Sequence, residues 1–290
     1  MKFIKLFETF TSQKELEKLC DICFEIIAEK TVSNIDSVDP ESPHYKITEL
    51  SKMKLSEIDI SQHSFSEIKS FIKDNRYLKI MIIDPVLVEG DFKLVANGVF
   101  ISSNNIILIK EKPNVLDDIN NYNTTLYKNR TSAVKQITSR EYKSILLHEL
   151  IHAYDHYRSS GKALLNPNYD NKLVNKYTDT SIEKTKEEIE ILQDNFKKYL
   201  NMRYEVDARF AEAIMNTDFY TLDLDKTMEQ RKKVYFIKDF KDAYNMFTNK
   251  FYAYKALDED QKKRVQSKFG KFYLLEKDLV DAMNSKSDSF

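Results

Sequence analysis

The chain has 290 residues, 42% of them hydrophobic and 12% aromatic, which is enough to bury the core of one large domain or two small ones. Its 45 lysine and arginine residues are balanced by 46 aspartate and glutamate residues, giving a formal net charge of -1. A chain without a global positive field lacks the electrostatic basis of a dedicated nucleic-acid binder. We therefore expect no nucleic-acid partner.

The sequence predicts a soluble, cytoplasmic protein. Lys5 and Glu8 interrupt the apolar run at the N-terminus, so no signal-peptide core forms. No uninterrupted apolar stretch reaches the roughly 18 residues that a membrane span needs, and we expect no membrane partner. Two cysteines cannot build a disulfide framework, which fits a reducing compartment.

Residues 1–76 are predicted to form an N-terminal helical region. Apolar residues at helical spacing predict an amphipathic helix over residues 12–30, and a second short helix is predicted over 64–73. Cys20 and Cys23 form a CxxC pair on the apolar face of the first helix. Because no second pair accompanies them, we expect buried structural cysteines rather than a metal or redox site.

Three β-rich runs follow, at residues 77–83, 92–101 and 106–110. The last two are separated by Ser102-Ser103-Asn104-Asn105, residue types that favour turns. They are therefore predicted to form a hairpin within a small sheet of three strands. Residues 111–138 are polar and rich in asparagine, with no clear period. We expect a lid or an irregular insertion there.

The clearest helix of the sequence is predicted to begin at Thr138. Thr138 and Glu141 have capping-box spacing, and Gly161 stands where a C-terminal cap belongs. After Pro167 the chain has no further proline and only one glycine, Gly270. Since both residue types break helices, the C-terminal two-fifths is predicted to be helical throughout.

That central helix carries the run His148-Glu149-Leu150-Ile151-His152, an HExxH motif. Histidines at i and i+4 lie one turn apart on the same face, so both imidazoles can reach one metal ion. Glu149 projects beside the pair, where it can accept a proton from a metal-bound water. A chance match to this pattern has odds on the order of a percent or less. The motif therefore predicts a zinc site with Glu149 as the general base.

The motif resembles the active-site helix of the zincin metallopeptidases, which lies behind a twisted sheet. The longer run from His148 to His156 is also similar to mitochondrial-type and phage-encoded members that read H-E-L-x-H-A-x-D. The resemblance implies a Zn²⁺-dependent peptidase acting on a peptide or protein. The glycine and third histidine of the metzincins are absent. His156 lies about 80° around the helix from His148, and three ligands on one straight helix cannot enclose an ion, so we do not expect His156 to bind the metal.

In the glutamate-ligand (gluzincin-like) branch, the third ligand comes from a later helix. Here the best candidate run is Arg203 to Ala213, in which Glu205, Ala208 and Glu212 share a face. Its sequence Glu-x-Asp-Ala-Arg resembles the third-ligand helix of several such families. We predict Glu205 as the third zinc ligand, with Glu212 and Asp207 as the alternatives.

Other residues are candidates for support of the reaction. Asp155, at i+7 from His148, faces nearly the same way and could accept an imidazole N–H. A tetrahedral intermediate needs a donor besides the metal. Tyr199, Tyr204 and Arg209 all lie near the proposed third ligand, and nothing in the sequence separates them.

Zincins bind the substrate backbone along an edge strand that precedes the active-site helix. Residues 94–100, followed by a tight turn and residues 106–109, have that arrangement. Gly98 would let a substrate backbone come close, and Asn97 could hydrogen-bond it. The alternative is a plain Asn-Gly turn within a shorter three-strand meander.

A stripe of aromatic residues recurs at helical steps with interleaved lysines near the C-terminus. Such regularity favours a core-facing seam over a surface that stacks on single-stranded bases. The stripe consists of Phe236, Phe240, Tyr244, Phe247, Phe251 and Tyr254. The acidic run 187–190 is predicted to be a solvated face.

Together these patterns predict an α+β fold, with a small mixed sheet, the active-site helix and a largely helical C-terminal half. The zincin-like core is predicted over residues 77–220 and a C-terminal helical region over 221–290. Leu6-Phe7-Glu8 resembles the cleavage site of phage head-maturation proteases, which suggests a phage-encoded, virion-associated protein. The alternatives to a general peptidase are a catalytically idle zincin-like binding or virion-associated protein and a toxin-like protease with one host target.

Overall fold

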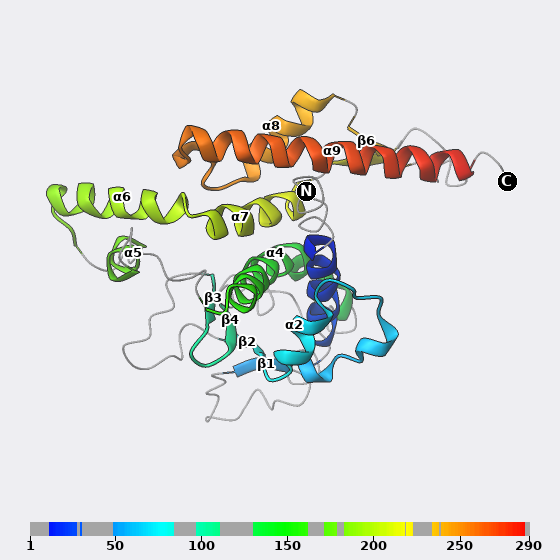
Figure 1. The fold of residues 1–290 in the computed structure, drawn as a ribbon, viewed down its shortest axis with the longest axis horizontal. Coiled ribbons are helices and arrows are strands. Elements are labelled where there is room, and N and C mark those ends of the chain that lie inside the picture. The colour runs from blue at the N-terminus through cyan, green and yellow to red at the C-terminus, as the bar shows by residue number, and fades with distance from the viewer. Residues whose placement is uncertain are drawn as a thin grey trace. The chain divides into compact units, whose positions relative to one another are not determined.

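The computed structural model describes residues 12–27, 30, 49–83, 97–110, 130–161, 171–178, 183–217, 219–222, 234–237 and 239–287. The chain divides into two compact units, residues 1–196 and 197–290. Figure 1 labels the helices and strands. The predicted α+β class is confirmed, since a small mixed sheet is combined with many helices. Within the described residues, no helix has the length and apolar character needed to cross a membrane.

The first unit contains a four-stranded sheet, in the order β1-β2-β4-β3. β1 pairs with β2 antiparallel, β2 with β4 parallel, and β4 with β3 antiparallel. Among the described strands, β3 therefore lies at one edge of the sheet. The strands are β1 (Glu49–Lys54), β2 (Lys79–Ile83), β3 (Gly98–Ile101) and β4 (Ile106–Lys110).

The fourth strand, β1, was not predicted, and the sheet thereby crosses the predicted boundary at residue 76. Its sequence ELSKMK carries three charges and only two apolar residues, which is too weak an alternation to indicate a strand. Tertiary packing supplies what the local pattern lacks, because Met53 lies opposite Ile80 and both are fully buried. Two short 3-10 helices, η1 (Leu55–Glu57) and η2 (Ile60–Gln62), follow β1.

The hairpin between β3 and β4 agrees with its prediction. Residues 102–105 form the turn, and Asn105 adopts a left-handed conformation with φ of 51°, which asparagine tolerates better than most residues. The Asn105 carbonyl accepts a hydrogen bond from the Lys79 backbone N–H at 3.0 Å, which ties the turn to the start of β2. The predicted strand residues 92–96 lie outside the described residues.

Helix α4 (Arg130–Arg158) contacts β3 and β4 and carries the HExxH motif. It begins eight residues before Thr138, so the predicted start and capping box at Thr138 are wrong. No proline or glycine between Arg130 and Thr138 would stop the helix from extending backwards. Its end agrees with the prediction: Gly161 N–H bonds the His156 carbonyl at 2.8 Å, and Ser160 N–H the Tyr157 carbonyl at 3.1 Å. Both Ser160 and Gly161 have positive φ, as in a Schellman motif.

Residues 12–27 form the predicted first helix, which packs against α4. Cys20 Sγ lies 3.2 Å from the Lys143 carbonyl, and Lys143 pairs with Asp21 at 2.6 Å. Cys20 and Cys23 are both free and fully buried, as predicted. Burial raises the pKa of both thiols, so neither is a nucleophile at neutral pH.

A carboxylate on this first helix binds the backbone just before α2 (Lys69–Asp74), which is shorter than the predicted helix over 64–73. Glu15 accepts backbone N–H bonds from Ser66, Glu67 and Ile68 at 2.8 to 3.0 Å, and a bond from the Ser66 hydroxyl at 2.6 Å. Burial alone would raise the pKa of Glu15, but these hydrogen bonds outweigh it and the pKa is lowered. Glu15 thereby links two segments that are about 50 residues apart in sequence.

We expect Glu15→Gln to lower the free energy of unfolding by about 1 kcal/mol, because the charge-assisted hydrogen bonds from residues 66–68 are weakened. The difference from the wild type should be full above the unfolded-state pKa of 4.5 and disappear as pH falls through the lower folded-state pKa. Urea unfolding at several pH values measures this. Glu25→Gln, at an exposed position on the same helix, is the control and should change little. Equal losses in both variants at neutral pH would contradict this role of Glu15.

Helix α5 (Asn171–Thr178) belongs to the first unit, and α6 (Lys186–Leu200) crosses the division between the units. The predicted solvated run 187–190 is mostly exposed on α6. The second unit contains α7 (Arg203–Met215), α8 (Phe240–Lys250), a 3-10 turn η5 (Tyr254–Ala256) and α9 (Glu259–Ser287). Between α7 and α8 in the sequence, β5 (Tyr220–Leu222) and β6 (Val234–Phe236) form a two-stranded antiparallel sheet.

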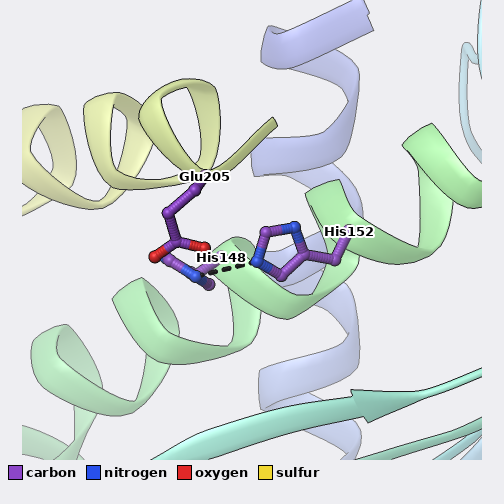
Figure 2. Close-up of side chains that lie close together, drawn as sticks. All are labelled: His148, His152 and Glu205. Atoms are coloured by element: carbon purple, nitrogen blue, oxygen red, sulfur yellow. Dashed lines mark hydrogen bonds between the residues drawn. The ribbon is translucent and has the colours of Figure 1, made fainter. Parts of the chain in front are cut away.

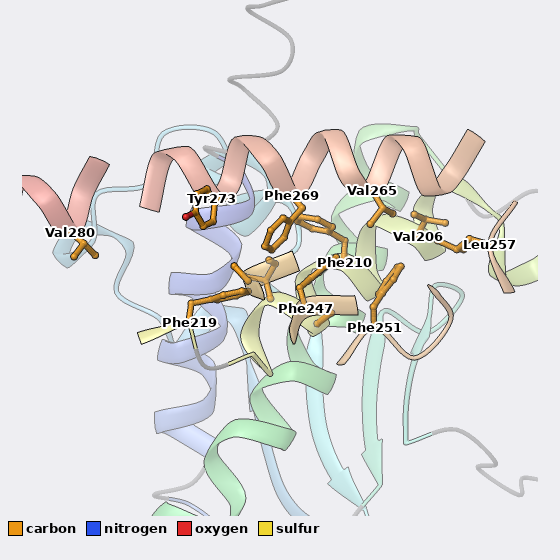
Figure 3. Close-up of a cluster of buried hydrophobic side chains, with 13 residues drawn as sticks. Val206, Phe210, Phe219, Phe247, Phe251, Leu257, Val265, Phe269, Tyr273 and Val280 are labelled. Carbon is orange, nitrogen blue, oxygen red and sulfur yellow. The ribbon is translucent and has the colours of Figure 1, made fainter. Parts of the chain in front are cut away.

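The prediction of helix throughout the C-terminal two-fifths is therefore wrong at β5 and β6. Each strand has only three residues, too few to show a β pattern, and no proline or glycine marks the break. The predicted aromatic seam consequently spans β6, α8 and η5 rather than a single helix. Its core-facing character is confirmed at Phe247 and Phe251, which are buried among residues of α7 and α9 such as Phe210 and Phe269 (Figure 3).

Candidate metal centre

The two motif histidines converge on one point. His148 and His152 are both buried on α4, and their Nε2 atoms lie 3.0 Å apart (Figure 2). Their rings are nearly perpendicular, at 88°, with centroids 4.6 Å apart. Two nitrogen ligands at about 2.1 Å from a tetrahedral zinc would be about 3.4 Å apart. The i, i+4 spacing thus produces a separation close to that of a shared metal.

Glu149, the predicted general base, is buried beside edge strand β3. A Cβ added to Gly98 would lie 3.0 Å from Glu149 Oε1 and 2.6 Å from Ile145 Cγ2. The missing side chain of Gly98 therefore makes room for α4, whereas the sequence suggested room for a substrate backbone. Asn97 is exposed immediately before β3. Substrate binding by Asn97 and Gly98 stays a prediction.

Glu205, the predicted third ligand, lies in the first turn of α7 and is fully buried. Its Oε1 is 2.6 Å from Arg209 Nε, and its Oε2 accepts a hydrogen bond from the Tyr199 hydroxyl at 2.7 Å. Burial alone would lower the pKa of Arg209, but the Glu205 charge outweighs it and the pKa is raised. Arg209 stays a cation, and Glu205 has an opposite charge beside it.

Among the described residues, one group of three possible metal ligands meets: His148, His152 and Glu205 offer ligand atoms that all lie within 4.8 Å of one another (Figure 2). These are the three residues that the sequence predicted as zinc ligands.

The alternative third ligands are engaged elsewhere. Asp207 pairs with Arg264 at 2.6 Å and with Lys268 at 3.1 Å, both on α9. Burial would raise the pKa of Asp207, but these two cations outweigh it and the pKa is lowered. Glu212 lies 3.9 Å from Arg209 Nη1 and is partly exposed. Asp207 thus holds α7 to α9, and Glu205 is the carboxylate that joins the histidine pair.

His156 is not part of this group of described residues, and its predicted absence from the metal ligands stays a prediction. Its ring meets the Phe100 ring edge-on at 5.7 Å and covers the helix end at Gly161. Asp155 is half-buried on α4 and Tyr204 is buried on α7, and the roles predicted for both stay predictions.

The sequence could not choose among the three residues near Glu205, and the structure separates them. Tyr199 and Arg209 both touch the Glu205 carboxylate. Arg209 is at i+4 from Glu205, the usual spacing of a helical ion pair, so this contact was open to sequence reasoning. Tyr199 lies six residues earlier, across the break between α6 and α7, and no periodicity links the two.

No protein-family model, no curated protein and no solved structure matches this chain. The chemistry of the donor set must therefore indicate the ligand. Two imidazole nitrogens and one carboxylate oxygen, all buried, are a typical set of three protein ligands in a catalytic zinc site, where a fourth position takes water or substrate. The residues present fit zinc.

Proposed function

We propose that the protein is a zinc-dependent metallopeptidase in which His148, His152 and Glu205 hold the ion. The observation that carries the proposal is the grouping of these three ligands with Glu149, the residue between the two histidines, buried in the same helix. The resemblance of the HExxH motif to zincins supports a peptidase within the wider class of zinc hydrolases.

When bound, zinc would lower the pKa of a water to about 7 and polarise the carbonyl of the scissile bond. Glu149 accepts a proton from the attacking water and passes it to the leaving amine. Its burial against β3 shields it from bulk water. His148 and His152 lie one turn apart on α4, so a single helix would present both imidazoles to the ion.

A peptide or protein substrate fits the strand arrangement. β3 is the last of the described strands in the order β1-β2-β4-β3, and an extended peptide could pair with its outer edge as an added strand. The same strand contacts Glu149 through the close approach of Gly98. A peptide lying along β3 would therefore pass near the general base.

The proposal is tested on the full chain purified in zinc-containing buffer. We expect about one zinc per chain, together with cleavage of a peptide library or of a whole proteome that stops when a chelator removes the metal. A wild-type protein that carries no zinc after this purification would contradict the proposal. Zinc without any cleavage would favour the catalytically idle binding protein, and cleavage confined to one proteome target would favour a toxin-like protease.

A further inference from the structure

Both oxygens of the Glu205 carboxylate have a partner within the second unit. Arg209 Nε lies 2.6 Å from Oε1, and the Tyr199 hydroxyl donates to Oε2 at 2.7 Å. An ionised carboxylate has about four lone-pair sites, so a carboxylate oriented by two such contacts is still able to bind a metal ion. The two contacts fix the direction in which the carboxylate points.

We propose that Arg209 and Tyr199 are positioning residues that hold the Glu205 carboxylate ready to bind the metal. The inference rests on the proposed zinc site and identifies the residues of this chain that would set its affinity. It is independent of whether the loaded site cleaves peptides.

Arg209 is itself held in place. Its guanidinium lies 5.4 Å from the centre of the Tyr252 ring, and Nη1 lies 3.9 Å from Glu212 Oε2. Only 17% of its side chain is exposed. A fully buried carboxylate is costly unless a charge or hydrogen bonds compensate it. Arg209 supplies that compensation in the metal-free protein, so Glu205 remains buried and oriented before zinc arrives.

Two effects of Arg209 on zinc binding have opposite signs. A cation beside a metal site repels the metal, so charge alone predicts tighter zinc binding when Arg209 is removed. A positioning role predicts weaker binding, because the freed carboxylate must be ordered when the metal binds. The close Nε–Oε1 contact and the burial of Glu205 favour positioning as the larger effect.

The test is the zinc dissociation constant of the full chain, measured by competition with a chromophoric chelator. We expect Arg209→Gln to weaken zinc binding by about 10–100-fold, and Tyr199→Phe by about 2–10-fold. Arg264→Gln is the matched control, since it removes the same charge from the Asp207 pair that joins α7 and α9. It should change the dissociation constant less than about twofold.

A second arm shows whether Arg209 acts through Glu205. In a Glu205→Ala background, Arg209→Gln should no longer weaken zinc binding, because only the repulsion between the Arg209 charge and the metal remains. Arg209→Lys keeps the charge without the planar guanidinium and should fall between wild type and Arg209→Gln. If Arg209→Gln does not fold, the zinc dissociation constants of Tyr199→Phe and Arg209→Lys test the inference instead. Both variants keep a cation beside Glu205, and weaker binding than in the wild type is expected for both.

Equal or tighter zinc binding in Arg209→Gln overturns the inference while leaving the proposed function intact. An undiminished effect of Arg209→Gln in the Glu205→Ala background overturns it as well. A wild-type chain without zinc overturns both the proposed function and this inference. A chain that binds zinc as described but cleaves nothing overturns only the peptidase.

Discussion

Replacement of Glu149 by glutamine is expected to reduce peptide hydrolysis by about 10²–10⁴-fold while the protein keeps its zinc. Glutamine has the size of glutamate but cannot take up a proton, and Glu149 is not among the three grouped ligands. The burial of Glu149 against β3 leaves little room for another base to replace it. Metal analysis and initial cleavage rates on the same preparation measure the two effects.

The matched variant is His148→Ala, one residue earlier on α4. Because His148 is one of the three grouped ligands, its loss should remove both zinc and activity. The two variants together separate proton transfer from metal binding. Full activity in Glu149→Gln would exclude Glu149 as the general base, and loss of zinc in that variant would indicate a structural rather than chemical role.

The parts of the site that lie within one helix could be predicted from the sequence. His148 and His152 come together because a 3.6-residue period fixes their relation locally. The same period places Cys20 and Cys23 on a buried face. Glu205 was predicted on a different basis, the similarity of its sequence run to the third-ligand helix of known families. Its burial and its grouping with the histidines come from the structure.

Other features depend on contacts between distant segments, which no local pattern contains. β1 becomes a strand because Met53 packs opposite Ile80, although its own sequence is highly charged. Glu15 binds the backbone of residues 66–68, about 50 residues away. The start of α4 was predicted eight residues too late for a local reason. The residues between Arg130 and Thr138 permit a helix but carry no specific signal that one begins there.

Gly98 is the position at which a single methyl group is expected to affect the reaction most directly. In Gly98→Ala the added Cβ would lie 2.6 Å from Ile145 Cγ2 and 3.0 Å from Glu149 Oε1, distances that require a neighbour to shift. The φ angle of Gly98 is not positive, so the backbone itself accepts alanine. The effect should therefore be steric. We expect a free energy of unfolding lower by about 1–3 kcal/mol and a kcat lower by about 10²-fold, with zinc retained.

The control is Gly270→Ala on α9, where the added Cβ would meet only Phe240 Cε2 at an ordinary 3.9 Å. Alanine is preferred to glycine within a helix, so this variant should be as stable as the wild type or up to about 1 kcal/mol more stable, with unchanged kcat. Urea unfolding, zinc content and cleavage rates are measured for both variants below the temperature at which either begins to unfold.

The added methyl group of Gly98→Ala can displace either Ile145 or Glu149. Which of the two moves decides whether the variant loses more stability or more activity. Ile145 is buried on α4 and its Cγ2 branches close to the backbone, so it can move only by a costly rotamer change or by separating α4 from β3. Glu149 would be met at Oε1, the far end of its longer side chain, and at Cγ at 3.1 Å, contacts that are less close than the one to Ile145. We therefore expect the general base to be displaced, and kcat to fall further than the stability loss alone would explain. A destabilised Gly98→Ala protein with wild-type kcat would show that Ile145 absorbs the clash and that β3 does not position Glu149.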